Sequence, residues 1–589
     1  MERNGMKKMM VQGIAGVLMA VCGTAQANLI SNGSFDAGIL TANEGRYEPV
    51  TGTGSKIAPW VCASGKAGLT TANGLWVKEG LNVGKHALYL QTFNYPADSY
   101  GASGDTSVWQ AFDVSERGDY RLGFDYTGRP GMFGAETRLR LYKGEGTQGV
   151  KVWERTVTAT TAAAFIRYEA FLEITEPGRY TLQFFQEQEA GFRMDKTIVI
   201  DEVVFVRDPL YSAVKAEQAG IAHSEYDVAA YVWPAYQPDP RWAELGIFKA
   251  GIGEWQNVKE AVPKWPGHNQ PRVPAWGYEN ETDPQVMAKK IDAAVSHGVN
   301  VFIYDWYWYG GHPFLERAVH DGFLGASNNG KMRFFFMWAN HHFNRICDNT
   351  VADKQPGRPI WLGWVDAEMF RAMSNRLIDM YFSRPNYYRI GGKPVFMIYE
   401  VGTFVQGLGG VENAAESLRR FREACERAGL GGIHLMACDY GLDPGHIAKL
   451  DIDSATMYNF IHWSGLKGLQ EDYSDWAERS LARFDVAERS LGLKAYFAHA
   501  SIGWDTNPRY PATCVMPTAV NATPVAFARI LRRAKAWCDT HTPKGYPKLI
   551  SINAWNEWIE GSYLEPDERF GMGYLETVRN LFMDKSTEK

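Results

Sequence analysis

The stretch SINAWNEWIEGSYLEPD, residues 551–567, carries three glutamates and two tryptophans. Glu557 and Glu560 are three residues apart, so a helical turn after Trp555 would place their Cβ atoms about 5 to 6 Å apart on one face. Carboxyl groups separated by about 5 to 5.5 Å are typical of retaining glycosidases, and so close a pair can hold one member protonated and the other ionised. The spacing therefore indicates acid–base cleavage of a glycosidic bond. The alternative is a solvated pair on a loop.

Strands and helices that could position this pair alternate along the second part of the chain. The predicted strands are DVAAYVWPAY, VNVFIYDWYWYG, KMRFFFMWANHHF, KPVFMIYEVG, GIHLMACDYG, IDSATMYNFIHW, LKAYFAHASIGWD and KLISINAWNEW. Between them lie helical segments with regular ends, such as residues 282–298, which have Asp283 as cap, Pro284 at the first position and Gly298 as terminator. This alternation over residues 226–583 predicts a (β/α)8 TIM-type barrel. The alternative is a doubly wound sheet, but no Gly-rich phosphate turn follows the first strand.

Polar and aromatic residues gather at the ends of the predicted strands, where such barrels carry their reacting groups. With Glu557 and Glu560 as the catalytic pair, the candidate substrate-binding residues are Trp233, Tyr236, Glu254, Trp255, His268, Asp305, Trp306, Trp308, Asn340, His341, Trp504, Asp505 and Trp558. Flat aromatic rings suit the apolar faces of sugars, and 13% of the chain is aromatic. For Glu254 and His268 the alternative is to hold a loop, and for Asp305 and Asp505 a buried salt bridge.

Two neighbouring features are predicted to have other roles. His341 and His342 are adjacent, and if their segment is a strand, their side chains point to opposite faces, so we predict no shared metal site. We favour one of them as a hydrogen-bonding partner of sugar, with a core role as the alternative. Glu565 is interpreted as a structural partner of the strand-eight pair. No metal or other cofactor is predicted.

Residues 28–208 follow the pattern of an all-β domain. In GRYTLQFFQ, for example, Tyr180, Leu182 and Phe184 alternate with polar residues, as in a half-buried antiparallel strand. Many such runs with almost no helix predict a β-sandwich. Residues 209–225 are predicted to be the connecting segment between the sandwich and the barrel.

The first 27 residues have the pattern of a signal peptide, with a basic start, an apolar run and a small-residue site ending at Ala27. A secreted or periplasmic protein is therefore expected. The alternative is a lipoprotein anchor on Cys22, but the bulky Val21 before it is unfavourable. No later apolar run is long enough to span a bilayer. The net charge of −6 argues against nucleic acid as a partner.

Four segments, in order along the chain, resemble the glycoside hydrolase family 99-like proteins, a group that includes WbsX-like polysaccharide proteins and, more remotely, endo-α-mannosidases. They are GIGEWQNVKEAVPKWPGHNQPRVPAWGY, MWANHHF, GWDTNPR and NAWNEWIEGSYLEPD. The resemblance extends from about Tyr226 to Arg579. In addition, NLISNGSFDAG and IVIDEVVFV in the first domain resemble jelly-roll carbohydrate-binding modules of secreted hydrolases; a structural or spacer role is the alternative.

This resemblance implies a secreted retaining glycoside hydrolase that acts on an α-linked polysaccharide or oligosaccharide of the α-mannoside or α-rhamnoside type. By the endo-mannosidase pattern Asn-Glu-Trp-x-Glu-Gly, Glu557 would deprotonate the 2-hydroxyl of the sugar to give a 1,2-anhydro intermediate, and Glu560 would be the acid/base. Two departures are Ile559, where mannosidases have a polar residue, and Asn-His-His at 340–342, where WbsX-like relatives more usually have Asn-Glu-Asn. Two alternatives stay open: a glycosyltransferase, for which Asp451-Ile452-Asp453 offers an Asp-x-Asp match, and a non-catalytic glycan-binding protein.

Overall fold

The computed structural model describes residues 27–36, 47–52, 57–71, 77–78, 81, 86–92, 104–131, 134–188, 196–221, 224–355 and 357–583. The chain divides into two compact units, Met1–Ala216 with Asn375–Arg384, and Glu217–Ser374 with Pro385–Lys589. The predicted signal peptide up to residue 26, with Cys22, lies outside the described residues. None of the described helices combines the length and the apolar character that a membrane span requires.

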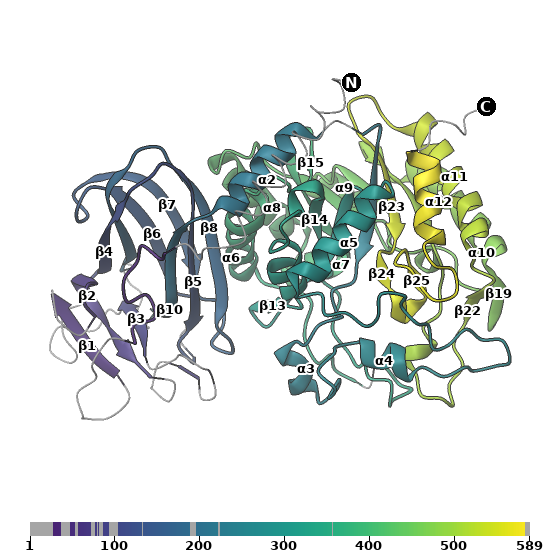
Figure 1. The fold of residues 1–589 in the computed structure, drawn as a ribbon, viewed down its shortest axis with the longest axis horizontal. Helices are drawn as coiled ribbons and strands as arrows, with labels where there is room; N and C mark the ends of the chain where they lie inside the picture. The colour runs from purple at the N-terminus through teal and green to yellow at the C-terminus, as the bar shows by residue number, and fades with distance from the viewer. Residues whose placement is uncertain are drawn as a thin grey trace, which may run out of the picture. The chain divides into compact units, whose positions relative to one another are not determined.

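The first unit is built from antiparallel strands (Figure 1). They are β1 Tyr47–Gly52, β2 Val61–Thr70, β3 Ala87–Thr92, β4 Thr106–Val114, β5 Gly118–Gly128, β6 Glu136–Lys143, β7 Val150–Thr158, β8 Ile166–Ile174, β9 Gly178–Gln186 and β10 Lys196–Arg207. Their order is β7-β6-β9-β4-β2-β3-β10-β5-β8, with β1 beside β2. Tyr180, Leu182 and Phe184 of β9 all join one apolar core, as their alternation predicts. The first domain is therefore rich in antiparallel sheet, consistent with a β-sandwich.

The predicted connecting segment contains a helix, α2 Pro209–Gly220. Its start is regular, because Pro209 lies in the first turn and Asp208 Oδ1 accepts a hydrogen bond from the backbone N of Tyr211 at 2.9 Å. Only Val214 of this helix is buried. So narrow an apolar face gives too weak a pattern to be recognised as a helix in the sequence.

The second unit contains a barrel of parallel strands. They are β11 Tyr226–Val232, β12 Val301–Tyr309, β14 Arg333–Trp338, β16 Lys393–Ile398, β17 His434–Cys438, β18 Ser454–Thr456, β20 Ala495–Tyr496, β21 Ala498–Ser501 and β23 Lys548–Asn553. β20 and β21 are the two parts of one strand interrupted at Phe497; the first part pairs with β18 and the second with β23. The nine strands thus act as eight and make a TIM-like barrel, as the sequence predicts.

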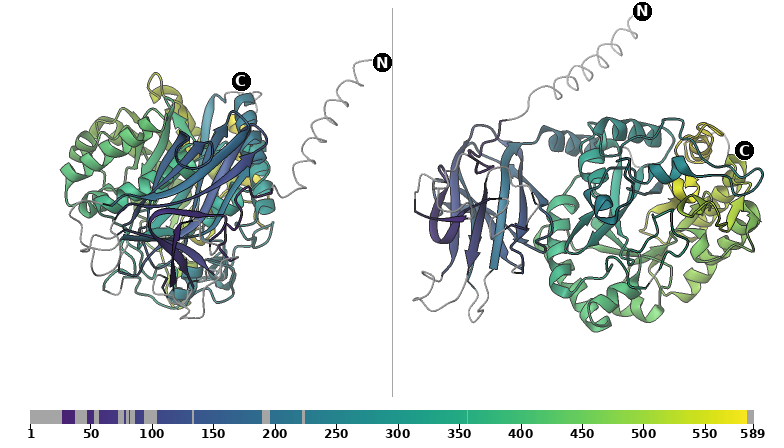
Figure 2. Two further views of the ribbon diagram at one scale, coloured as in Figure 1. Left: turned by 90° about the vertical axis from the view of Figure 1, so that its left-hand side faces the viewer. Right: turned by 90° about the horizontal axis from the view of Figure 1, so that it is seen from below.

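Helices fill the connections between these strands and lie around them in the view from below (Figure 2). They are α3 Pro240–Leu245, α4 Trp255–Glu260, α5 Pro284–Ser296, α6 Ala367–Leu377, α7 Val401–Gly407, α8 Val411–Arg427, α9 Pro444–Leu450, α10 Tyr473–Ser490, α11 Pro524–His541 and α12 Gly573–Phe582. Short strands are β13 His312–Phe314, β15 Arg389–Ile390, β19 Gln470–Asp472 and β22 Thr518–Val520. Asp283 caps α5 by accepting from the N–H of Gln285, as predicted, and Thr523 caps α11 in the same way through Ala526.

Candidate active site

A cavity of about 600 Å³ opens at the C-terminal ends of the barrel strands. Every strand contributes to it: Trp233 follows β11, Asp305 and Tyr307 lie on β12, His341 and His342 follow β14, Tyr399 and Glu400 follow β16, Tyr440 follows β17, Tyr458 and His462 follow β18, Trp504 and Arg509 follow β21, and Glu557 and Glu560 follow β23. The volume lies in the usual range of small-molecule sites. The position is the one at which TIM barrels carry their active sites.

The strand-eight glutamates lie on a tight turn. Residues Trp558–Glu560 form one turn of 3₁₀-helix between two short paired strands, β24 Asn556–Glu557 and β25 Ser562–Tyr563. Side chains three residues apart eclipse each other in a 3₁₀-helix. Glu557 and Glu560 therefore face the same cavity, as the spacing predicts. Gly561 ends the turn with φ 65°, in the left-handed region that favours glycine.

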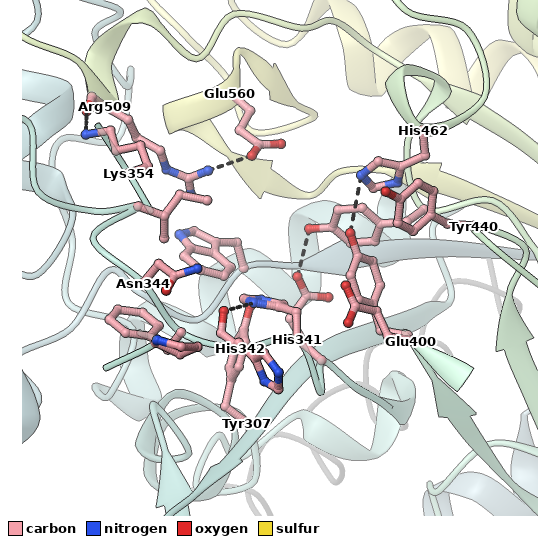
Figure 3. Close-up of a pocket in the computed structure, with 18 of the residues that line it drawn as sticks. Tyr307, His341, His342, Asn344, Lys354, Glu400, Tyr440, His462, Arg509 and Glu560 are labelled. Atoms are coloured by element: carbon pink, nitrogen blue, oxygen red, sulfur yellow. Dashed lines mark hydrogen bonds and ion pairs between the residues drawn. The ribbon is translucent and has the colours of Figure 1, made fainter. Parts of the chain in front are cut away.

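Arg509 lies between three buried carboxylates. Its Nη1 is 2.6 Å from Glu560 Oε1 (Figure 3). Its Nη2 is 3.3 Å from Glu557 Oε1 and its Nε is 3.0 Å from Glu254 Oε1. Glu254 also accepts a hydrogen bond from Trp233 Nε1 at 2.7 Å. Glu254 is not among the residues that line the cavity; it holds Arg509 and Trp233, which are.

The two glutamates differ in their proton affinity. Burial raises the pKa of Glu557 well above its usual range, and the nearby charge of Glu560 raises it further, while Arg509 lowers it. Burial also raises the pKa of Glu560, but Arg509 opposes this effect. Because Arg509 approaches Glu560 more closely than Glu557, the negative charge is more stable on Glu560. Glu557 is therefore the more readily protonated member of the pair.

Three acidic residues that line the cavity each keep one buried oxygen for which the described residues supply no hydrogen bond. These oxygens are Glu557 Oε2, Glu560 Oε2 and Asp305 Oδ1. The other oxygen of Asp305 accepts from the hydroxyl of Tyr458 at 2.8 Å, and burial raises the pKa of Asp305 well above its usual range. Since buried polar atoms are normally paired, this set suits a ligand that is rich in hydroxyl groups.

Tyr440 and His462 lie on the side of the cavity away from Arg509 (Figure 3). The hydroxyl of Tyr399 lies 3.2 Å from Nε2 of His462, whose ring stacks on Tyr458 at a centroid distance of 5.7 Å. Burial lowers the pKa of His462 to about 4 and also lowers the pKa of His341. Both rings are therefore neutral at neutral pH, and each can donate and accept one hydrogen bond.

Of the predicted substrate-binding residues, Trp233, Asp305, His341 and Trp504 line the cavity together with both glutamates. Tyr236, Glu254, Trp255, His268, Trp306, Trp308, Asn340, Asp505 and Trp558 do not. The reason for Trp306 and Trp308 is strand alternation: Asp305 and Tyr307 of β12 face the cavity, so the tryptophans between and after them face the opposite side.

Other predicted residues that do not line the cavity pack behind the residues that do or bind their backbone. Trp255 packs between Tyr236 and Trp558, at centroid distances of 3.9 and 5.8 Å, so these three rings form a buried cluster. The side chain of Asn340 pairs with both backbone groups of Glu400, at 2.8 Å each, and thereby positions the end of β16.

His268 and Asp505 join two loops. Asp505 Oδ2 lies 2.9 Å from His268 Nε2 and 3.0 Å from Arg272 Nη2, and it accepts from Gln270 Nε2 at 2.8 Å. Burial opposes ionisation of Asp505, but Arg272 and the hydrogen bond from His268 outweigh it and lower the pKa. Asp505 is thus a buried anion that ties the loop after β11 to the loop after β21. For His268 the structure therefore agrees with the alternative role of holding a loop. For Asp505 it agrees with the alternative of a buried salt bridge.

The prediction that His341 and His342 point to opposite faces depends on their segment being a strand, and this condition is not met. β14 ends at Trp338, so His341 and His342 lie in the loop beyond it, and both line the cavity. Strand alternation therefore does not separate them. His342 Nδ1 accepts from the backbone N of Gly363 at 3.0 Å, which fixes its tautomer. Within the described ranges, no group of three or more His, Cys, Asp or Glu side chains is arranged to hold a metal ion.

Several cavity residues were not selected from the sequence. Tyr399, Glu400, Tyr440, Tyr458 and His462 all lie in the C-terminal halves of predicted strands four to six, so the strand-end criterion could have found them. Arg509 lies in the quoted segment GWDTNPR. Lys354 had no such signal, because it belongs to the long loop after β14; it donates to the carbonyls of Asp348 and Arg509 at 2.6 Å each. Burial lowers its pKa to about 8.

Fold and site together define the class: this is a TIM-like barrel protein with an acidic and aromatic cavity at the C-terminal ends of its strands. The chain belongs to the family described as glycosyltransferase WbsX, whose model matches residues 228–578. It is 27% identical over 395 residues to the uncharacterized protein WxcX of Xanthomonas campestris pv. campestris, a match that covers 62% of this chain and 52% of that protein. The chain thus spans about half the length of the curated relatives it matches.

Similar solved structures include the GH99 endo-alpha-mannosidase from Bacteroides thetaiotaomicron, with 14% identity, a TM-score of 0.39 and coverage of 61% of this chain and 97% of that chain. A structure described as a glycoside hydrolase-like protein has 12% identity and a TM-score of 0.40 and covers 63% of this chain and 99% of its own. A structure described as "CBM4 structure and function" covers 30% of this chain and 99% of its own, with 14% identity and a TM-score of 0.18.

Proposed function

We propose that this protein is a retaining glycoside hydrolase that cleaves an α-linked glycan in the cavity at the strand ends. The observation that carries the proposal is the buried pair Glu557 and Glu560, which shares Arg509 and keeps one unpaired oxygen on each side chain. Two close carboxyl groups of raised pKa retain one proton between them. Such a pair supplies the acid and the base that glycoside cleavage needs.

In the proposed reaction, Glu557 takes the proton of the sugar's 2-hydroxyl, and the 2-oxygen attacks C1. The bond from C1 to the leaving oxygen breaks, and Glu560 gives that oxygen a proton. Glu560 then removes a proton from water, which opens the 1,2-anhydro ring at C1, while Glu557 returns its proton to the 2-oxygen. Each step inverts C1, so the configuration is retained. Because the surroundings of the pair favour a proton on Glu557, this assignment requires the bound sugar to move that proton to Glu560.

This route restricts the substrate to sugars whose 2-hydroxyl is trans to the leaving group, as in α-mannosides and α-rhamnosides. The unpaired oxygen of Asp305 and the neutral rings of His341 and His462 supply further partners for hydroxyl groups. We further propose that the first unit is a jelly-roll module that helps to hold the polymer, and that residues 1–27 export the chain. The expected location is outside the cytoplasm.

A glycosyltransferase is the second candidate, because the family description names that activity. Its predicted Asp-x-Asp match, however, lies at the start of β18, the end opposite the cavity. There Lys494 pairs with Asp451 at 2.9 Å and with Asp453 at 2.6 Å. An ion-paired site away from the cavity is a poor place for a metal-bound sugar nucleotide.

The test compares wild type, Glu557→Gln and Glu560→Gln on α-mannans, α-rhamnans and other α-linked glycans, with released sugars and their anomeric configuration followed by NMR. Glu568→Gln, an exposed change on the same segment, is the matched control. Products of retained configuration from wild type and the control, absent with both glutamate variants, are expected. Release that survives in both variants contradicts the two-glutamate mechanism. Consumption of nucleotide sugars without hydrolysis favours the transferase.

A further inference from the structure

Two neighbouring aromatic residues beside the cavity are unusually exposed. Tyr440 and Trp463 have exposed fractions of 47% and 43%, the highest of any Phe, Tyr or Trp side chain in the described part of the chain. The many other aromatic residues there are buried or half-buried. Leaving large rings in water forgoes the free energy of their burial, so an exposed pair of this kind is typical of a binding surface.

The two residues follow neighbouring strands of the barrel. Tyr440 follows β17 and Trp463 follows β18, and these two strands pair in parallel. Tyr440 lines the cavity, and its ring lies 4.8 Å from that of His462, the residue before Trp463. Figure 3 shows Tyr440 and His462 on the side of the cavity away from Arg509 and Lys354. A ligand held by the glutamates would thus reach Trp463 only by extending out of the cavity.

Trp463 is held in a fixed orientation. The guanidinium of Arg483 lies against its ring, with Cζ 4.5 Å from the ring centroid. Arg483 itself is anchored, since its Nε donates to Asp439 Oδ2 at 2.7 Å. The next residue, Ser464, accepts hydrogen bonds of 2.7 Å from the side chains of Trp476 and Arg479 on α10. A ring that is already ordered loses little conformational entropy when a ligand packs on its exposed side.

We propose that Trp463, together with Tyr440, forms an outer subsite for a glycan chain that extends from the cavity. A sugar ring packs the apolar C–H groups of one face on the exposed side of the indole, while its hydroxyl groups remain in water. The subsite rests on the proposed function, because it takes the same chain that the glutamates cleave. The consequence is a preference for long substrates over short ones, as in an enzyme that acts within a polymer.

The test uses the inactive Glu557→Gln protein, titrated calorimetrically with an α-mannan, an α-rhamnan and size-fractionated oligosaccharides of each. Trp463→Ala in this background should weaken binding of the long oligosaccharides by about tenfold, the effect of losing one apolar contact of this size. Disaccharide binding should be unchanged, and Trp463→Tyr, which keeps a flat ring, should retain most of the affinity. Trp276→Ala is the matched control, since Trp276 also stacks on a cation, Lys289, but belongs to the segment between β11 and β12 instead of the ends of β17 and β18.

The same substitution in the active enzyme supplies a kinetic readout. Trp463→Ala should raise KM for long chains and leave kcat unchanged, because a subsite far from the reacting bond contributes equally to the ground state and the transition state. Equal affinity of Trp463→Ala and its parent at every chain length overturns the outer subsite and leaves the hydrolase intact. Equal loss for disaccharides and long chains also overturns it, since Trp463 would then act on the cavity itself. If wild type hydrolyses none of these glycans and the parent binds none, the proposed function fails together with the subsite.

Discussion

Arg509 sets the charge balance of the cavity. Its guanidinium contacts Glu254, Glu557 and Glu560, and the residue is buried at the wall of the cavity. A planar group with several fixed donors suits this task, whereas a lysine could not meet three carboxylates at once. Without this cation, Glu557 and Glu560 would lose the positive charge that lowers their pKa, and both would hold a proton more strongly.

Replacing Arg509 with Gln should therefore shift the pH dependence of catalysis. Arg509 lowers the raised pKa of both cavity glutamates, Glu557 and Glu560, so its loss raises both further. The acidic limb of the profile of kcat/KM against pH reports the ionisation of the base and should move to higher pH. The exposed Arg569→Gln serves as control. An acidic limb at the wild-type position in Arg509→Gln would contradict this account.

Helix α5 and the strand-eight turn are joined by a buried ion cluster. Lys290 of α5 lies 2.6 Å from Glu281 and 2.6 Å from Glu565. Glu281 accepts from Asn556 at 2.9 Å, and Glu565 accepts from Trp558 at 2.7 Å. These two partners are the residues on either side of Glu557. The contacts confirm Glu565 as a structural partner, and they show how a helix fixes the position of Glu557 through the residues on either side of it.

Lys290→Met should destabilise the protein strongly. Removing the only cation of a buried cluster leaves uncompensated charge, which typically costs about 3 to 5 kcal/mol. Lys289→Met is the matched control, because Lys289 is the exposed neighbour and pairs with Glu279 at the surface. Its cost should stay below about 1 kcal/mol. Urea unfolding followed by tryptophan fluorescence measures both, and equal free energies of unfolding for the two variants would refute the role of the cluster.

The strand-eight turn also depends on Gly561. A Cβ atom there would lie 2.7 Å from the guanidinium of Arg272, at a backbone φ of +65°. Gly571 has φ +54° but open space around it, so Gly571→Ala carries only the backbone cost of about 1 to 2 kcal/mol. Gly561→Ala should lose that stability and also displace the glutamates, with a larger fall in kcat. Equal kcat in the two variants would argue against tight packing of the turn.

At the scale of the whole molecule, the cavity contains buried acidic groups that lower the stability of the fold. Three carboxyl groups with raised pKa are buried together, and each keeps an oxygen that no described residue pairs. The surrounding barrel, closed through the interrupted seventh strand, holds them in place. Residues that are unfavourable for folding persist where function requires them.

Glu557→Gln should accordingly raise the unfolding temperature at neutral pH. The folded-state pKa of Glu557 is raised above the usual 4.5, so its contribution to stability is greatest below that pH and is lost as pH rises toward the folded-state pKa. The neutral Gln does not suffer this loss. The difference from wild type should vanish in acid, below about pH 4. Thermal unfolding at both pH values, with Glu568→Gln as control, measures it; a variant less stable than wild type at neutral pH would contradict the sign.

The sequence by itself determined the two-part organisation, the eight barrel strands and the position of the glutamate pair. These features are local: strand and helix periodicity, caps such as Asp283 and the three-residue spacing of Glu557 and Glu560 are all written in adjacent residues. The prediction that Trp306 and Trp308 line the cavity is wrong, because proximity to a strand end does not say which face of the strand a side chain takes.

Only the tertiary structure decided which side chains meet across the barrel mouth. Arg509 contacts Glu254 and Glu560, which lie far from it in the chain. Asp505 forms a salt bridge instead of facing a sugar because His268 and Arg272, on a distant loop, pack against it. The physical reason is that a buried charge is stable only beside an opposite charge or a hydrogen-bonding group. Which of these groups lies beside it depends on the packing of strands and loops that are far apart in the sequence.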